Sequence, residues 1–425
     1  MSRYFLIITL VVAGEIVFGL PFHTARFFRP TLLEAFSFTN TELGDVFAVY
    51  GVTAMLAYFP GGMLADRFSA RSLLTVSLLA TGAGGFYMAT YPGVWGMALL
   101  YGYWGVTTIL LFWAALIRAT REWGGHTSQG RAFGVLEGGR GIAAAIFATL
   151  GIAVLAGYLP DDAANVTNEE RRAAFRAVIF MYSIAAIVTA GLTWLLIPPV
   201  KHVGDSSQGL FHNAALVTRR PLVWAQAAVI VCAYCGYKGL DNYSLYAVQV
   251  LGMDEIEGAQ LSAYGAYIRP FAAITAGFAA DRWSASKTIG ASFFVLLMSY
   301  GMLSIALPDG SGLMVIYANI LVSFFAVFAL RGVYFALLEE NKTPALLTGA
   351  VAGMVSFVGY TPEIFFAPIT GRILDASPGV VGHQNYFLFL TAVATIGIAV
   401  VGVLLRLQRS DRHAQWPSRA SSGTK

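Results

Sequence analysis

The feature that most constrains this chain is a series of twelve apolar runs, each long enough to cross a lipid bilayer. A membrane-spanning helix needs about 20 apolar residues. Only 12% of the residues are charged, whereas soluble domains carry about 25%. Each run is predicted to be a helix, because backbone groups in lipid need hydrogen bonds within their own segment and barrel strands are shorter. The runs cover approximately residues 4–22, 43–64, 72–91, 94–117, 133–157, 176–197, 223–250, 259–280, 288–307, 313–336, 347–371 and 385–406.

A polar turn between the second and third runs recurs once, about half a chain later. Gly61–Arg71 contains Asp66 followed by Arg67, and the related stretch Gly277–Lys287 contains Asp281 followed by Arg282. The two aspartates are 215 residues apart, which predicts two similar halves. The predicted division is an N-terminal six-helix bundle at 1–197, a cytoplasmic linker at 198–222, a C-terminal six-helix bundle at 223–407 and a cytoplasmic tail at 408–425.

The distribution of charge predicts how the chain lies in the membrane. Cations such as Arg3, Arg67 and Arg219 gather in the segments on one side, and carboxylates such as Glu169 and Asp254 gather in the opposite loops. This positive-inside bias predicts a multi-pass protein of the cell membrane with both termini in the cytoplasm. The basic tail is interpreted as part of this signal and not as a nucleic-acid site. The first run is interpreted as a retained helix, because removal as a signal peptide would leave eleven helices.

Twelve helices, a central linker and the turn Gly62, Leu64, Ala65, Asp66, Arg67 and Arg71 resemble the major facilitator superfamily. A weaker copy lies at Gly277, Asp281, Arg282 and Lys287. The resemblance implies an all-α membrane protein whose twelve transmembrane helices form two pseudo-symmetric six-helix bundles. It also implies that the turns lie on the cytoplasmic side and help to latch an outward-facing state. The residues with this implied gating role are Asp66, Arg67, Arg71, Asp281 and Arg282, and the alternative for the cations is that they set topology alone.

Within the superfamily, residues 38–44, 104–123 and 353–375 are loosely similar to the organophosphate:phosphate antiporters. Members of that branch hold a phosphate between basic residues of the first and seventh helices. The residues in those places here are His23 or Arg26 and Lys238. The fifth run lacks the proline motif of drug:proton antiporters, which argues against a drug exporter.

Ionisable residues inside the apolar runs are candidate functional groups, because a charge at the bilayer centre costs about 2.5–3.5 kcal/mol on insertion scales. The 215-residue offset maps His23 onto Lys238 and Arg26 onto Asp241. We therefore expect the first and seventh helices to bring basic groups to one anion. Lys238 and Asp241 are three residues apart on one helix face, and an alternative is that they neutralise each other.

Three further sets of residues complete the candidate site. Arg269 and the neighbouring tyrosines Tyr237, Tyr264 and Tyr267 are predicted to bind substrate, with a structural partner such as Glu363 as the alternative for Arg269. The carboxyls Glu15, Asp241 and Glu363 are predicted to couple protons, because a poorly solvated carboxyl can carry one. Arg118 and Arg331 are expected at the inner mouth, where a cation draws in an anion or pairs with Glu339 and Glu340.

These residues predict a secondary transporter that moves a small organic solute by alternating access. Cations outnumber carboxylates among the candidates, which favours an anion, coupled to protons or exchanged. A neutral sugar or drug carrier is the alternative, and a non-transporting membrane sensor is the alternative from another class. We expect no enzyme activity, no cofactor and no metal site, and we interpret Cys232 and Cys235 as two buried thiols. The expected partners are the substrate, the lipid bilayer and a proton, with no nucleic acid, and the expected state is a monomer.

Overall fold

The computed structural model describes residues 3–125, 129–159, 166–199, 217–308, 312–343 and 345–410. Within these ranges every regular element is a helix, and each of the twelve predicted runs is largely helical. The predicted linker at 198–222 falls mostly outside the described residues, and so does the predicted tail beyond Ser410. Six of the described helices are long and apolar enough to cross a membrane unaided, and two bent pairs raise that number to eight.

The elements fall into two sets, one on each side of the central gap in the description. The first half contains α1 (Arg3–Ile16), η1 (Gly19–His23), α2 (Thr24–Phe27), α3 (Arg29–Phe36), α4 (Asn40–Arg67), α5 (Ala70–Met88), α6 (Val94–Gly105), η2 (Val106–Trp113), α7 (Ala114–Gly124), α8 (Gln129–Tyr158) and α9 (Asn168–Leu196). The second half contains α11 (Pro221–Gly239), η4 (Leu240–Asn242), α12 (Tyr243–Gln249), α13 (Glu255–Arg282), α14 (Ala285–Leu303), α15 (Leu313–Val333), η5 (Tyr334–Ala336), α16 (Leu337–Glu340), α17 (Ala345–Gly359), α18 (Pro362–Ala376) and α19 (Val380–Ser410).

Several helices are bent where they approach the middle of the molecule. Pro21 lies in the π-helical turn η1, and the axis turns by 42° between residues 4–16 and 19–27. Pro60 lies inside α4, which turns by 53° between residues 40–58 and 60–67. A proline lacks the N–H of a regular helix and clashes with the preceding turn, so both bends have a local cause.

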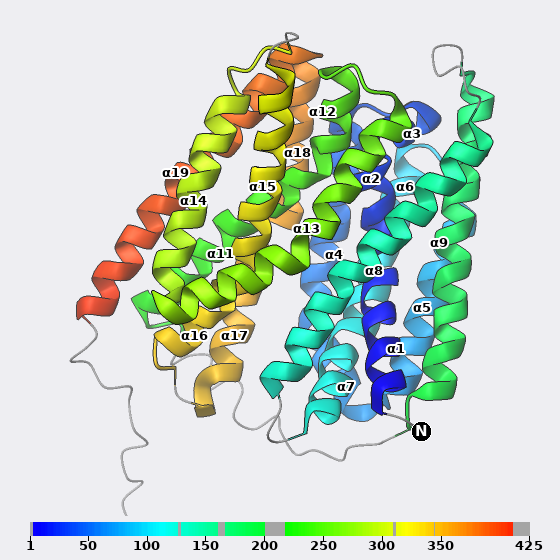
Figure 1. The fold of residues 1–425 in the computed structure, drawn as a ribbon. Helices are drawn as coiled ribbons and strands as arrows, with labels where there is room; N and C mark the ends of the chain where they lie inside the picture. The colour runs from blue at the N-terminus through cyan, green and yellow to red at the C-terminus, as the bar shows by residue number, and fades with distance from the viewer. Residues whose placement is uncertain are drawn as a thin grey trace, which may run out of the picture.

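The two halves meet at one end of the molecule and diverge at the other (Figure 1). The contacts between halves pair α4 with α18 and α8 with α13, and α2 and α3 add contacts with α12 and α13. The start of α1 and the end of α19 both lie at the diverging end. We call the end where the halves meet the closed end.

Glycines allow the backbones of α4 and α18 to approach closely. A Cβ atom at Gly51 would lie 2.6 Å from the carbonyl carbon of Glu363, and one at Gly44 would overlap the carbonyl oxygen of Ala367. No other residue therefore fits at these positions without separating the helices. This interface lies in the part of α4 that is remote from the Asp66 turn.

Polar bonds between the halves add to this packing at the closed end. The Asp375 carboxylate of α18 accepts the backbone N–H groups of Asn40, at 3.2 Å, and Thr41, at 2.6 Å. One half thereby caps the first turn of a helix in the other half, where a negative charge also suits the helix dipole. Arg372 of α18 donates to both oxygens of Asp45, at 2.8 and 3.1 Å.

Replacing Asp375 with alanine should expose the first turn of α4. The loss of an N-terminal cap costs about 0.5–2 kcal/mol, so amide hydrogen exchange at Asn40 and Thr41, whose N–H groups the carboxylate accepts, should accelerate by about 2- to 30-fold. Glu42 should change less, because its N–H is held by Thr39 in the capping box of α4 itself. The first turn of α9 is the internal control, because Thr167 and Glu170 form its own capping box. Unchanged exchange at Asn40 and Thr41 in the variant would show that the carboxylate does not hold the two halves together.

Candidate functional site

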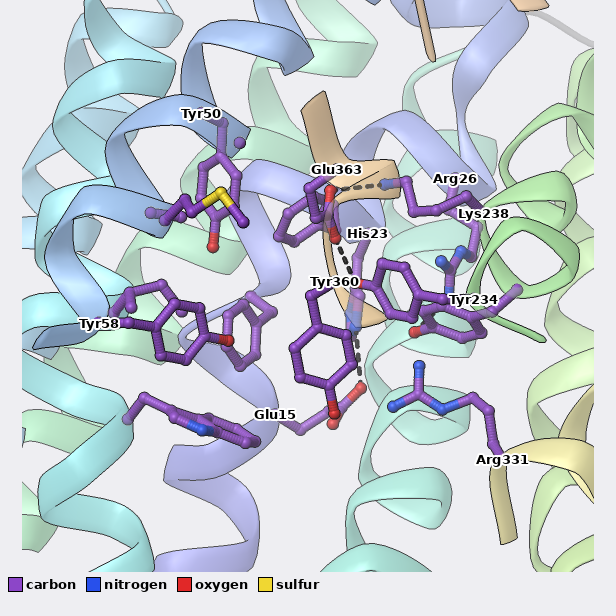
Figure 2. Close-up of a pocket in the computed structure, with 18 of the residues that line it drawn as sticks. Glu15, His23, Arg26, Tyr50, Tyr58, Tyr234, Lys238, Arg331, Tyr360 and Glu363 are labelled. Carbon is purple, nitrogen blue, oxygen red and sulfur yellow. Dashed lines mark hydrogen bonds and ion pairs between the residues drawn. The ribbon is translucent and has the colours of Figure 1, made fainter. Parts of the chain in front are cut away.

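A cavity of about 110 Å³ lies between the two halves, which is room for several water molecules (Figure 2). Both halves contribute to its wall. The charged residues and the histidine that line it are Glu15, His23, Arg26, Arg140, Lys238, Arg331 and Glu363. Its aromatic lining consists of Phe18, Phe22, Tyr50, Tyr58, Trp113, Tyr234, Tyr237, Phe357 and Tyr360.

The first charge cluster of the cavity connects the two halves. Asp241 of η4 accepts a bond of 2.5 Å from Arg26 of α2 and forms an ion pair of 2.9 Å with Lys238. Lys238 also lies 3.3 Å from Glu363, which follows the break between α17 and α18. The Arg26 guanidinium donates a second bond to the hydroxyl of Tyr237, at 2.8 Å. Two cations and two carboxylates balance in this cluster.

The second charge cluster surrounds Glu15, in the last turn of α1. Its carboxylate lies 3.0 Å from Arg140 and 3.8 Å from Arg269, and it is hydrogen-bonded to His23 at 3.1 Å. Glu137 completes the cluster at 2.7 Å from Arg140 and 3.1 Å from Arg269. Arg269 extends from α13, so this cluster also crosses between the halves. The two arginines and two carboxylates of this cluster again balance.

Arg331 stands apart from both clusters. It extends from the last turn of α15, and its guanidinium carbon lies 3.8 Å from the centre of the Tyr237 ring. Within the part of the chain that the structure describes, it forms no ion pair with a carboxylate. The cavity and its two clusters therefore hold five cations and four carboxylates, and Arg331 is the surplus charge.

The structure places some predicted binding residues in the cavity wall and others outside it. His23, Arg26, Tyr237 and Lys238 line the cavity, but Lys238 is only 2% exposed and packs over the rings of Phe22, at 4.6 Å, and Phe47. His23 binds Glu15 and does not converge with Lys238.

The predicted substrate-binding residues of α13 lie on different faces of that helix. Arg269 borders a smaller pocket beside Glu15, together with Ser262 and Ala266. Tyr264 and Tyr267 are 55% and 45% exposed and do not line the cavity. Residues 262, 266 and 269 share one helix face, whereas a residue two positions from Arg269 points elsewhere. Nearness in sequence to a cation was therefore not enough to predict which tyrosines line the cavity.

The predicted proton-coupling residues are each held by a cation in this structure. Glu15 pairs with Arg140, whereas Asp241 and Glu363 pair with Lys238. The alternative in which Lys238 and Asp241 neutralise each other describes the observed geometry. Arg269 contacts Glu15 and Glu137, not Glu363.

The two turns with expected gating roles lie at the diverging end. The side chains of Asp66, Arg67, Asp281 and Arg282 are exposed. Two other expected gating cations bind within their own half. Arg71 stacks on Trp194, with its guanidinium carbon 3.9 Å from the ring centre, and Arg118 donates to the carbonyl of Phe68 at 2.9 Å. Arg331 lies in the cavity wall, although the sequence grouped it with these residues.

The sequence profile of the Major Facilitator Superfamily matches residues 11–367, which is most of the chain. The chain belongs to this superfamily. It is 27% identical to the inner membrane protein YihN of Escherichia coli K12 over 97% of each chain. It is 25% identical to the inner membrane protein YqcE of the same organism, over 99% of this chain and 98% of the relative.

A solved structure of similar fold is a bacterial homologue of the human lysosomal transporter Spinster, in an inward-facing, unoccupied conformation. The TM-score is 0.72 at 14% identity, and the match covers 98% of each chain. At this identity the likeness concerns the fold. Together with the superfamily profile, it shows a multi-pass membrane protein with the fold that the apolar runs and the resemblance of the Asp66 turn led us to expect.

Proposed function

We propose that this protein is a secondary active transporter that moves a small organic anion across the cytoplasmic membrane by alternating access. The observation that carries the proposal is the surplus cation of the central cavity, Arg331, beside two clusters whose charges balance. A charge in the membrane interior has a large energetic cost unless it is compensated. A bound anion supplies the missing compensation. A neutral sugar remains the alternative substrate, because tyrosines form much of the cavity wall.

The proposed cycle uses the two ends of the molecule in turn. The diverging end, with the exposed Asp66 and Asp281 turns, is assigned to the cytoplasm, as the positive-inside bias predicts. The α4–α18 interface and the Asp375 cap then close the outer side. An outward-facing state requires this interface to separate and the turns to latch.

Glu363 is the proposed site of proton coupling. Its carboxylate faces the cavity, lies 3.3 Å from Lys238 and accepts a hydrogen bond from the hydroxyl of Tyr234. Protonation of Glu363 would leave Lys238 with Asp241 as its remaining carboxylate partner, at 2.9 Å. The cavity would then become more positive and bind an anion more tightly. Asp241 and Glu15, which each pair with more than one basic residue, are the less accessible candidates.

The substrate class is tested with ligands that differ only in charge. Glucose 6-phosphate, glucuronate and glucose share one ring, and a compound that binds the native state raises the unfolding temperature by mass action. We expect the two anions to raise the unfolding temperature of the purified protein and glucose to leave it unchanged. A wider panel of phosphorylated and carboxylated metabolites extends the comparison, followed by counterflow in proteoliposomes. Stabilisation by neutral compounds alone would replace the anion proposal with the neutral-carrier alternative.

A further inference from the structure

We propose that Arg331 and Tyr58 bind the two ends of one substrate, which is an anion with a hydroxyl-bearing body. Arg331 takes the anionic group, and the hydroxyl of Tyr58 forms a hydrogen bond with the body. This inference rests on the proposed function and specifies its substrate class and docking residues. The docking cation it names differs from those that the sequence predicted.

The other cations of the cavity are already engaged by carboxylates. Arg26 lies 2.5 Å from Asp241, and Arg140 lies 3.0 Å from Glu15. Lys238 is almost fully buried and lies between two carboxylates. A substrate anion at any of these positions would have to displace a bonded carboxylate. At Arg331 it meets a guanidinium that is held in place by Tyr237 and whose donors have no carboxylate partner among the described residues.

The ring of Tyr237 lies between Arg331 and Arg26, whose bond to Asp241 joins the two halves. The guanidinium carbon of Arg26 lies 4.3 Å from the ring centre, and Arg26 also bonds the Tyr237 hydroxyl. Arg331 stacks on the same ring at 3.8 Å. Stacking on tyrosine favours a cation electrostatically and fixes the plane of the guanidinium. The fork of donors is thereby oriented before an anion arrives, which lowers the entropy lost on binding.

Tyr58 is the corresponding free polar group in the first half. The hydroxyls of the neighbouring tyrosines are in use: Tyr50 bonds Thr108 at 2.8 Å, and Tyr234 bonds Glu363. The hydroxyl of Tyr58 forms no hydrogen bond with the described part of the chain, although Tyr58 lines the cavity. Tyr58 is the last residue before the bend at Pro60. Figure 2 shows its ring pointing into the cavity from the side opposite Arg331.

This arrangement defines the chemistry of the ligand. One guanidinium suits a single phosphate or carboxylate group, which accepts two parallel hydrogen bonds. Tyr58 suits a hydroxyl of the ligand, and the rings of Tyr360 and Trp113 offer faces for an apolar ring surface. Because Arg331 and Tyr58 belong to different halves, a ligand that reaches both connects the halves. A bare inorganic anion reaches Arg331 alone.

The test measures binding by quenching of tryptophan fluorescence in the purified full-length protein, because Trp113 lies in the cavity wall. The probes are glucuronate with acetate and glucose 6-phosphate with inorganic phosphate, so each pair compares an anion with and without a hydroxylated ring. In the wild type we expect each ring-bearing anion to bind at least tenfold more tightly than its bare partner. Arg331→Gln should weaken both ring-bearing anions by about 10- to 100-fold, the range for loss of a charged hydrogen bond.

Tyr58→Phe should weaken the ring-bearing anions by about 3- to 10-fold and leave acetate and inorganic phosphate unchanged. Arg331→Lys, which keeps the charge, should retain part of the affinity and serves if Arg331→Gln fails to fold. Arg409→Gln is the matched control, because it removes one exposed positive charge from α19, outside the cavity.

The outcomes separate this inference from the proposed function. If the wild type binds the anions and Arg331→Gln or Arg331→Lys binds them equally well, the docking assignment is wrong while anion transport stands. If Tyr58→Phe weakens bare and ring-bearing anions alike, the ligand does not connect the halves. If neither ring-bearing anion binds the wild type, the assignment to hydroxylated anions is overturned as well.

Discussion

Replacing Asp241 with asparagine is expected to cost about 3–5 kcal/mol of unfolding free energy, the range for removing one partner of a buried ion pair. Asp241 is the shared acceptor of Arg26 and Lys238, at 2.5 and 2.9 Å, and its side chain is almost fully buried. Without its charge, two cations face each other and Glu363 is the remaining carboxylate of the cluster. Denaturant or thermal unfolding of the purified protein in detergent measures this loss.

Two comparisons establish that the loss arises from the buried charge. Asp45→Asn removes a carboxylate from an ion pair whose side chains are about half exposed, and it should cost no more than about 1 kcal/mol. Lys238→Met combined with Asp241→Asn should be less destabilised than the sum of the single variants, because the pair is removed together. Equal losses for Asp241→Asn and Asp45→Asn would contradict the buried cluster.

Replacing Gly51 with leucine is expected to abolish transport while the protein still folds. The Cβ atom alone would lie 2.6 Å from the backbone of Glu363, closer than any stable contact, so α4 and α18 must separate. The closed end is then wedged apart, and a carrier that cannot close one end cannot complete its cycle. Initial rates of glucuronate or glucose 6-phosphate counterflow in proteoliposomes should fall to the level of empty vesicles.

A binding measurement distinguishes a folded Gly51→Leu variant with separated helices from a misfolded one. The variant should still bind inorganic phosphate, because Arg331 lies on α15 and a bare anion does not need Tyr58 of the displaced α4. Gly191→Leu in α9 is the matched control, since a Cβ atom there meets nothing within 4 Å, and it should transport normally. Full transport by Gly51→Leu would show that α4 and α18 do not need to meet during the cycle.

The sequence predicted the helices better than it predicted the contacts between them. Apolar runs of membrane length reveal helices directly, and the Asp66 turn identified the superfamily. The 215-residue offset paired Arg26 with Asp241, and these residues do form a bond. The offset also suggested that His23 and Lys238 converge, but each binds a carboxylate near it in the chain.

One physical reason explains why the positions of several side chains in the structure differ from those that the sequence predicted. A run that is apolar around most of its circumference does not show which face of the helix meets its neighbours. Arg331 was therefore assigned to a mouth by its depth in the run, and Tyr264 to the cavity by its nearness in sequence to Arg269. Arg140 and Glu137 are three residues apart and form a local pair, but the structure adds Glu15 from another helix, which spacing alone does not indicate. The sequence carried no signal for Tyr58, because the role that we propose for it depends on which tyrosine hydroxyls are already bonded in the packed helices.

The bond between Arg26 and Asp241 has a geometric consequence. The two residues occupy equivalent places in the two halves, and equivalent places come into contact only close to the axis that relates the halves. The bond joins α2 of one half to η4 of the other, two short elements that also pack against each other. Arg26 also lines the central cavity, and halves that rock around a central site move less there than at their two ends. We therefore expect the Arg26–Asp241 pair to stay closed through the proposed cycle and to act as its pivot, while the contacts at the two ends break and re-form.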